Sequence, residues 1–171
     1  MLRLLIATNN PGKVREIEAL LHSSSLELLT PASMGIDLQV EENGESYLEN
    51  AILKAKSFSA RSGLWTMADD SGLEVEALEG LPGLHSARFV QKPGATDADR
   101  RSWLLHVLHG KPKPWTAVFR CVLAVVSPSG SVESSEGICR GEIISAERGT
   151  SGFGYDPLFL ITELDKTMAE L

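Results

Sequence analysis

Two adjacent carboxylates, Asp69 and Asp70, are the residues whose type and spacing most directly suggest chemistry. They follow an apolar, strand-like run at residues 64–67 and precede Ser71-Gly72, a dipeptide typical of turns. Because successive side chains of a strand point to opposite faces, the two carboxylates cannot both face the same core. Carboxylates crowded at the end of a strand suit Mg²⁺, although a polar turn that caps a hairpin has the same composition.

Further carboxylates precede the segment that leads into this strand. Glu41 and Glu42 lie just before residues 46–61, whose apolar residues recur at helical spacing. If this helix packs antiparallel to the strand, its beginning lies at the same side as the strand's end. Glu41 or Glu42 would then approach Asp69 and Asp70. Three or four carboxylates without basic relief repel one another, so the sequence predicts a divalent cation among them.

The beginning of the chain predicts a phosphate-binding turn. Residues 2–7 form an apolar run typical of a buried strand, and a polar turn follows. Asn10 suits a helix N-cap and Pro11 suits the first helical position. A strand–turn–helix junction directs backbone N–H groups and the positive end of the helix dipole at an anion, and Lys13 adds a charge. The glycine spacings of the Walker A and Rossmann motifs are absent.

A glycine-rich loop at residues 148–157 carries two aromatic residues and a carboxylate. Such loops are often simple connectors. Phe153 and Tyr155 are costly to leave exposed without a partner, and Asp156 can accept hydrogen bonds. We therefore predict a loop that stacks on a base and reads its edge.

The overall composition limits the possible partners. The 171 residues suffice for one domain, residues 1–171, and the net charge is −7. An acidic chain is a poor binder of nucleic acid polymers. Cys121 and Cys139 form neither a zinc motif nor a disulfide framework, and no apolar run is long enough to span a membrane. No cleavable signal pattern begins the sequence, so we expect a cytoplasmic protein without a membrane partner.

Strand-like and helix-like segments are interspersed along the chain. Residues 96–109 predict a helix, with Thr96 and Asp99 as a capping box and Trp103 on its core face. Gly63 and Gly110 are expected to end helices. Strands are predicted at residues 2–7, 26–29, 64–67, 115–127, 131–140, 142–145 and 158–161, and residues 73–78 form a further short apolar run.

Five ordered segments together resemble one known family, the inosine-triphosphate pyrophosphatases. They are ATNNPGK at residues 7–13, ENAILKA at 49–55, ADDSGL at 68–73, PGLHSAR at 82–88 and SGFGYDP at 151–157. The resemblance spans nearly the whole chain. It implies an α/β fold with a mixed, elongated, twisted sheet flanked by helices, in two lobes with a cleft between them. It also implies a homodimer.

The resemblance further implies an activity and a set of site residues. The activity is hydrolysis of non-standard purine nucleoside triphosphates (ITP, dITP and XTP) to the monophosphate and pyrophosphate. Glu41 or Glu42 together with Asp70 would hold Mg²⁺, Asp70 would accept a proton, and Lys54 would face the phosphates. The residues implied to hold the triphosphate are Thr8, Asn9, Asn10, Pro11, Gly12, Lys13 and Ser71. Those implied to contact the base are Phe153, Gly154, Tyr155 and Asp156.

The family pattern continues beyond the residues present here. In the family, a lysine and then Ser-His-Arg follow the stretch found at residues 166–171, and they contribute to base and phosphate recognition. We therefore expect this chain, as given, to discriminate poorly between bases. Two alternatives to the predicted activity are a nucleotide-binding module with little turnover and a related pyrophosphatase for modified pyrimidines.

Overall fold

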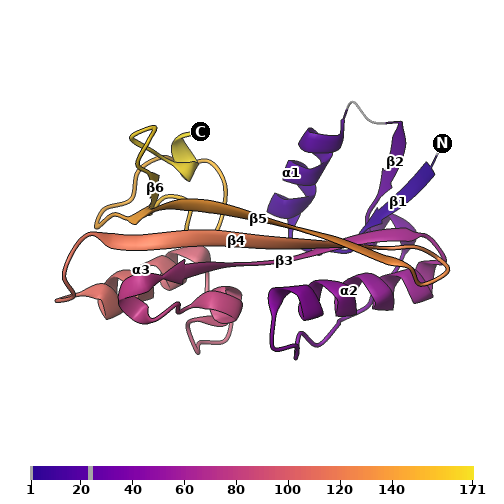
Figure 1. The fold of residues 1–171 in the computed structure, drawn as a ribbon, viewed down its shortest axis with the longest axis horizontal. Coiled ribbons are helices and arrows are strands. Elements are labelled where there is room, and N and C mark those ends of the chain that lie inside the picture. The colour runs from indigo at the N-terminus through magenta and orange to yellow at the C-terminus, as the bar shows by residue number, and fades with distance from the viewer. Residues whose placement is uncertain (1, 23–24) are drawn as a thin grey trace. The chain divides into compact units, whose positions relative to one another are not determined.

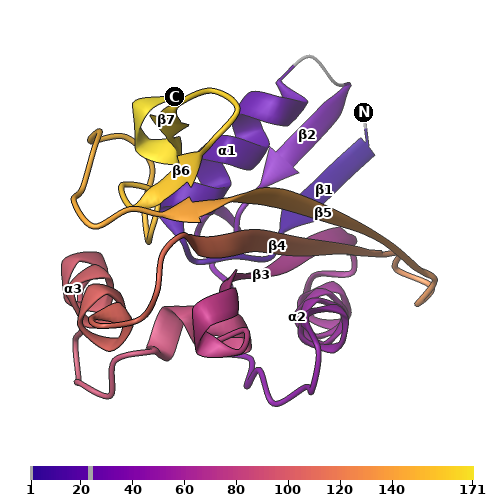
Figure 2. The same ribbon diagram turned by 60° about the vertical axis from the view of Figure 1, so that its left-hand side comes forward.

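The computed structural model describes residues 2–22 and 25–171. Over these ranges the strands form a mixed sheet in the order β2-β1-β3-β4-β5-β6-β7 (Figures 1 and 2). The strands are β1 (Leu2–Ile6), β2 (Leu26–Leu29), β3 (Trp65–Val75), β4 (Trp115–Val126), β5 (Val132–Ile143), β6 (Phe159–Ile161) and β7 (Lys166–Thr167). The α-helices are α1 (Pro11–Leu21), α2 (Tyr47–Ser62) and α3 (Asp97–Leu108). Short 3₁₀ helices are η1 (Ala32–Met34), η2 (Glu76–Leu78), η3 (Gly83–Arg88) and η4 (Met168–Glu170).

The sheet combines parallel and antiparallel pairs. β1 runs parallel to β2 and to the beginning of β3, whereas β6 runs antiparallel to β5 and β7. The prediction of an α/β fold with a mixed sheet flanked by helices is therefore confirmed. The chain divides into two compact units, a first at residues 1–70 and 121–137 and a second at 71–120 and 138–171. The single domain expected from the sequence stays a prediction.

In the first unit, α1 and α2 lie on opposite sides of β1 and the beginning of β3 (Figure 1). Alternate residues of each strand point to opposite faces, so each face has its own apolar core. The core on the α1 side includes Leu4, Ile6 and Met67, with Ile17 and Leu21 packed against it. The core on the α2 side includes Leu5, Ala7, Ala51, Ala55, Phe58 and Ala68.

In the second unit, α3 lies on one side of β4 and the segment with β6 and β7 lies on the other (Figure 2). Leu104 and Leu108 of α3 are fully buried. They pack in one core with strand residues and with residues next to the glycine-rich loop. These partners include Leu73, Val75, Trp115, Tyr155, Leu158 and Phe159.

The predicted caps Asn10, Thr96 and Gly63 are confirmed. α3, however, ends at Leu108 with His109 as its C-cap, one residue before the predicted stop at Gly110. The Asn10 side chain accepts hydrogen bonds from the first turn of α1, and Ser46 does so for α2. Thr96 and Asp99 form the expected capping box of α3. Gly63 ends α2 with a left-handed backbone, which glycine adopts at low cost. These features depend on side chains near each helix end, so they can be predicted from local sequence.

The turn predicted at Ser71-Gly72 is wrong, because β3 continues through both residues to Val75. β3 is an interior strand between β1 and β4. Ladder hydrogen bonds on both edges of such a strand outweigh the turn preference of a Ser-Gly dipeptide. The separate strand at residues 142–145 is also wrong, since β5 extends to Ile143.

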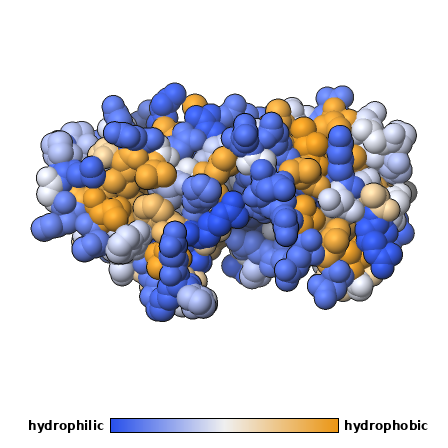
Figure 3. Space-filling view, turned by 90° about the horizontal axis from the view of Figure 1, so that it is seen from below, coloured by the Kyte–Doolittle hydropathy of each residue, from blue (hydrophilic) through white to orange (hydrophobic). Residues whose placement is uncertain are grey.

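The prediction that Trp103 lies on the core face of its helix is wrong. Trp103 is 42% exposed and does not belong to the core face of α3. On α2, Leu48 and Leu53 are also partly exposed. Figure 3 shows apolar side chains interspersed with polar ones over the α2 side, without one continuous apolar surface. Among the described residues, no helix is long and apolar enough to cross a membrane.

Candidate active site

Asp69 and Asp70 lie in β3 of the first unit, and each is 6% exposed. Their side chains meet different helices, as the alternation of a strand requires. Asp69 pairs with Lys13 from the first turn of α1. Asp70 accepts a hydrogen bond of 3.0 Å from Asn50 Nδ2 of α2. The prediction that the two carboxylates face different sides is therefore confirmed.

The Asp70 side of the strand forms a compact polar cluster with α2. Lys54 Nζ lies 3.1 Å from Glu42 Oε1 and 4.0 Å from Asp70 Oδ1. Asn50 and Lys54 are one helical turn apart, so both side chains reach the same carboxylate. Only 14% of the Lys54 side chain is exposed, so its charge is held close to its partners. This arrangement confirms that residues before α2 approach Asp70.

Asn50 has no role in the sequence prediction, yet it is the most buried polar residue of this cluster, at 1% exposed. Its Oδ1 accepts a hydrogen bond of 2.8 Å from Gly44 N, while its Nδ2 donates to Asp70. A Cβ on Gly44 would lie 2.7 Å from Asn50 Oδ1, so glycine permits this close approach. The available sequence signal is the helical spacing of Asn50 and Lys54, which begin a polar line continued by Ser57 and Arg61.

Burial and charge act in opposite directions on Asp70. Desolvation is the largest effect and raises the pKa of its carboxyl above the ordinary value. The hydrogen bond from Asn50 and the charges of Lys54 and Lys13 lower it, whereas Glu42 raises it. The net effect is a raised pKa, which brings this carboxylate closer to the range useful for a proton acceptor near neutral pH.

The two candidate metal-ligating glutamates differ in position. Glu42 is partly buried and contacts Lys54, whereas Glu41 is exposed. Within the part of the chain that the structure describes, no group of three or more His, Cys, Asp or Glu residues is arranged to hold a metal ion. The Lys54 ammonium nevertheless lies beside the oxygens of Glu42 and Asp70. Carboxylate oxygens are hard donors of the kind that Mg²⁺ prefers, so the chemistry of Glu42 and Asp70 fits a divalent ion.

The turn before α1 is more fully hydrogen-bonded than the sequence predicts. Asn10 Oδ1 accepts hydrogen bonds of 2.8 Å from Gly12 N and 3.4 Å from Lys13 N. Thr8 Oγ1 accepts one of 3.1 Å from Asn10 N. These three N–H groups are therefore not free to face an anion, because the Asn10 side chain satisfies two of them and the Thr8 hydroxyl satisfies the third.

The remaining predicted residues of the phosphate turn differ in exposure. Asn9 and Pro11 are exposed, whereas Gly12 is buried. Ser71 directly follows Asp70 along β3 and is partly buried. The structure thus brings Lys13, Asp69, Asp70, Lys54 and Glu42 into close polar contacts, and it leaves Asn9, Pro11 and Glu41 at the surface.

The glycine-rich loop belongs to the second unit, and its two aromatic residues have different surroundings. Tyr155 is 4% exposed, packs in the core, and its hydroxyl donates a hydrogen bond of 2.9 Å to Ser86 O. Its ring is therefore not available for stacking, which corrects the prediction for this side chain. Phe153 is only partly buried, and its N–H donates a hydrogen bond of 2.8 Å to Asp156 Oδ2.

The loop backbone requires glycine at specific positions. Gly152 and Gly154 have φ values of 74° and 59°. These values lie in the left-handed region, which glycine adopts readily and residues with a Cβ atom disfavour. A Cβ on Gly152 would also clash with the Asp156 carboxylate. The two glycines therefore allow the tight path that places Asp156 beneath the Phe153 amide.

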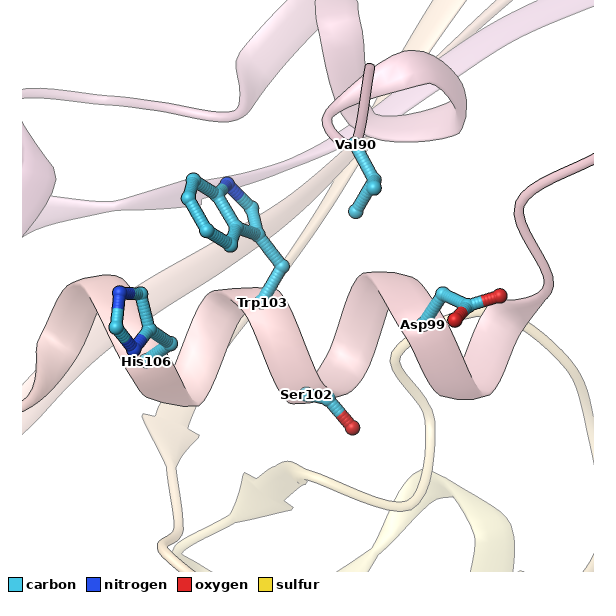
Figure 4. A pocket seen from close by; sticks show the side chains of 5 residues that line it. All are labelled: Val90, Asp99, Ser102, Trp103 and His106. Carbon is cyan, nitrogen blue, oxygen red and sulfur yellow. The ribbon is translucent and has the colours of Figure 1, made fainter. Parts of the chain in front are cut away.

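A separate, shallow pocket of about 330 Å³ lies along α3 in the second unit (Figure 4). Figure 4 shows Trp103 and His106 side by side on the same side of the helix, and their ring centroids are 5.1 Å apart. Its lining residues are Val90, Asp99, Ser102, Trp103 and His106. None of them belongs to the predicted site, so this pocket does not mark the proposed chemistry.

Comparison with known proteins gives consistent matches over nearly the whole chain. A model described as the Ham1 family matches residues 4–171. A dITP/XTP pyrophosphatase of Nostoc sp. is 46% identical over 169 residues, which are 98% of this chain and 82% of that protein. A dITP/XTP pyrophosphatase of Desulforamulus reducens is 43% identical and is covered to 85%, with 99% of this chain aligned.

Solved structures give the same result for the fold. The structure of a HAM1 protein from Coxiella burnetii matches with a TM-score of 0.88 and 34% identity, covering 100% of this chain and 87% of that one. A nucleoside-triphosphatase / dITP/XTP pyrophosphatase from Mycobacterium abscessus matches with a TM-score of 0.80 and 37% identity, covering 99% and 89% of the two chains. The resemblance found in the sequence motifs is therefore confirmed.

Proposed function

The chain belongs to the Ham1 family, and on that premise we propose that it hydrolyses non-standard purine nucleoside triphosphates (dITP, ITP and XTP) to the monophosphate and pyrophosphate. The observation that carries the proposal is the buried carboxylate of Asp70, in contact with Asn50 and close to Lys54. A carboxylate with a raised pKa beside cationic side chains suits proton transfer from water next to an anionic substrate.

The proposed reaction is attack of water on the α-phosphorus. A bond forms between the water oxygen and this phosphorus, and the bond from phosphorus to the bridging oxygen of the pyrophosphate breaks. Asp70 accepts the proton that the water loses. Lys13 and Lys54 stabilise negative charge on the phosphates, and they would exchange their present carboxylate partners for phosphate oxygens.

We propose Mg²⁺ as the divalent cation, held by Glu42 and Asp70. Glu41, which the sequence allows as an alternative, is exposed, whereas Glu42 shares Lys54 with Asp70. When bound, a divalent cation neutralises phosphate charge and lowers the pKa of a coordinated water. Thr8, Asn9, Asn10, Pro11, Gly12 and Ser71 are proposed as further contacts of the triphosphate.

The glycine-rich loop is proposed to contact the base. Phe153 is its partly exposed aromatic side chain, and Gly154, Tyr155 and Asp156 would contribute through the loop backbone and the Asp156 carboxylate. A donor aimed at the 6-oxo group of hypoxanthine or xanthine would face the amine of adenine instead. Each such mismatch costs about 1–3 kcal/mol, or a factor of about 5 to 150. Strong rejection of ATP therefore needs more than one contact of this kind.

Two further properties are proposed on the family resemblance. These are a homodimer in solution and a cytoplasmic location. Size-exclusion chromatography with light scattering tests the first property, and a mass equal to one chain would contradict it. Fractionation of cells that express the protein at its natural level tests the second.

The decisive experiment is product analysis with Mg²⁺ and ITP, with pyrophosphate and orthophosphate measured separately. We expect IMP and pyrophosphate in equal amounts from ITP, and the corresponding monophosphate with pyrophosphate from dITP and XTP. Release of orthophosphate with IDP would contradict attack at the α-phosphorus. Binding of ITP without any product would favour the alternative of a nucleotide-binding module. The close polar contacts of Lys13, Lys54 and Asp70 argue against that alternative.

A further inference from the structure

The peptide backbone at Gly154 is held on both sides by the beginning of α3. Its N–H donates a hydrogen bond of 2.8 Å to Asp97 Oδ2. Its carbonyl oxygen accepts one of 2.9 Å from Arg101 Nη1. A glycine at φ 59° is free to adopt several other conformations, so these two contacts fix a residue that the chain itself leaves flexible.

Asp97 and Arg101 reach the loop because of their place on the helix. Together with Leu104 and Leu108 they occupy positions i, i+4, i+7 and i+11, which form one face of α3. Leu104 and Leu108 are fully buried in the core of the second unit. The core therefore fixes the helix face, and its first turns present two charged side chains to the loop.

Both charged side chains are themselves restrained. Arg101 Nε donates a hydrogen bond of 2.8 Å to Glu147 Oε1, and only 15% of the Arg101 side chain is exposed. Asp97 Oδ1 accepts one of 2.6 Å from Arg100 Nη2. Partial burial works against ionisation of Asp97, but the contacts from Arg100 and from the Gly154 amide prevail and lower its pKa. Asp97 is thus an ionised acceptor across the physiological range.

The contacts of Gly154 determine the position of its neighbour. Phe153 lies between Gly154, which α3 holds, and the Asp156 carboxylate, which accepts the Phe153 N–H. On the other side, the Tyr155 hydroxyl binds Ser86 O and anchors the loop in the core. The backbone of Phe153 is therefore restrained from both directions, while its side chain stays partly exposed.

We propose that Asp97 and Arg101 are positioning residues that set base selectivity by holding Gly154, and through it Phe153, in the conformation that contacts the base. This rests on the proposed function in one respect, namely that the glycine-rich loop contacts the base. The two residues act through the loop backbone and do not themselves touch the reacting atoms.

The test compares Asp97→Ala and Arg101→Ala with the matched control Ser102→Ala. Ser102 is an exposed residue of the same helix and makes no hydrogen bond to the loop among the described contacts, whereas Arg100 binds Asp97 and is therefore unsuitable as a control. Hydrogen exchange of a peptide that spans residues 148–157 measures the hold on the loop. Loss of one such hydrogen bond should speed exchange about 10-fold in the two test variants and leave the control near the wild-type rate.

Kinetics then measure the effect on selectivity. We expect the KM for ITP to rise about 10-fold in both test variants, with kcat within about 2-fold of wild type, because binding of the base and not the chemistry is affected. The ratio of kcat/KM for ITP over ATP should fall by a similar factor. Asp97→Asn, whose amide oxygen can still accept the Gly154 N–H, should restore most of the wild-type KM.

Three outcomes separate the possibilities. Unchanged exchange and unchanged KM in Asp97→Ala and Arg101→Ala would overturn the positioning role. An equal effect of Ser102→Ala would also overturn it, because that result would indicate a general loss of helix stability. If the wild type does not hydrolyse ITP, the proposed function fails, and the hold on the loop is then decided by the exchange rates alone.

Discussion

Asp70 in the first unit and Asp97 in the second are both aspartates beside basic side chains, yet their surroundings act on them in opposite directions. Burial dominates at Asp70 and raises its pKa, although Asn50 and Lys54 oppose the shift. At Asp97 the contacts from Arg100 and the Gly154 amide prevail over burial and lower the pKa. A carboxylate whose charge is only partly compensated is suited to take up a proton, whereas a fully bonded one is suited to hold a backbone in place.

The largest effect should come from removing the carboxylate charge at Asp70. Asp70→Asn keeps the shape of the side chain but removes the proton acceptor, so we expect kcat for ITP to fall about 10³-fold. Steady-state kinetics with a circular dichroism spectrum to check the fold measure this. Glu45→Gln, which changes an exposed carboxylate outside the proposed site, is the control and should retain near-normal turnover. Near-normal turnover in Asp70→Asn would show that the assignment of the proton acceptor is wrong.

A second, smaller effect is expected at Lys54. Lys54→Met removes the ammonium beside Glu42 and Asp70, which we propose to stabilise phosphate charge, so kcat/KM should fall about 10²-fold. The variant also leaves Glu42 and Asp70 without their shared cation, which should raise the pKa of Asp70 further. Lys56→Met on the same helix is the matched control. Equal losses in both variants would indicate a general effect of charge rather than a local one.

The pH dependence should distinguish the two aspartates directly. In the metal-free protein the Asp70 pKa lies above its ordinary value of 3.8, and a bound divalent cation would lower it, so the acid limb of kcat/KM should move to lower pH as the Mg²⁺ concentration rises. Because the pKa of Asp70 is raised in the folded protein, protonation of Asp70 favours the folded state. The contribution of Asp70 to the free energy of unfolding therefore decreases as pH rises through its pKa in the folded state. Asp97 has a lowered pKa, so its stabilising contribution is present above 3.8 and is lost only as pH falls below that value.

A series of pH–rate profiles and urea unfolding curves checks this contrast. Asn50→Ala removes the hydrogen bond that lowers the Asp70 pKa, so the acid limb of kcat/KM should move to higher pH. Asp97→Asn should leave the acid limb in place, because Asp97 does not take part in proton transfer. An acid limb that follows Asp97 instead of Asn50 would reverse the roles we assign to the two regions.

The smallest effect is expected from Tyr155→Phe. Removal of the Tyr155 hydroxyl deprives Ser86 O of this hydrogen-bond donor. This loss should reduce the free energy of unfolding by about 1 kcal/mol. The KM for ITP should change less than about 2-fold, because the ring is in the core and remains there. Urea unfolding and steady-state kinetics measure the two quantities. A KM that rises strongly with little change in stability would instead indicate that Tyr155 contacts the base.

The parts of the site that could be predicted from the sequence depend on neighbouring residues. Asn10 and Pro11 indicate the beginning of α1. Asp69 and Asp70 are adjacent in a strand, so their side chains must point to opposite faces of the sheet wherever that strand lies. Asn50 and Lys54 share a helix face by their spacing alone. Each of these predictions needs only a few residues of the chain and the geometry of one element.

The parts that could not be predicted depend on distant residues. Ser71-Gly72 has turn composition, but interior pairing in the sheet makes it a strand. Phe153 and Tyr155 look equivalent in the sequence, and only the core around Leu104 and Leu108 decides that the tyrosine ring is buried. The hold on Gly154 comes from residues more than 50 positions earlier in the chain, and no local pattern encodes such a contact.

The pairing of Lys13 and Lys54 with Glu42, Asp69 and Asp70 also has a consequence for the rate of substrate association. Two ammonium groups face three carboxylates, and the chain as a whole carries a net charge of −7. A nucleoside triphosphate is itself an anion, so no long-range attraction guides it toward this cluster. In the absence of Mg²⁺, encounter should therefore be slow at low ionic strength and faster as salt screens the repulsion, and a divalent cation held by Glu42 and Asp70 would reduce that repulsion.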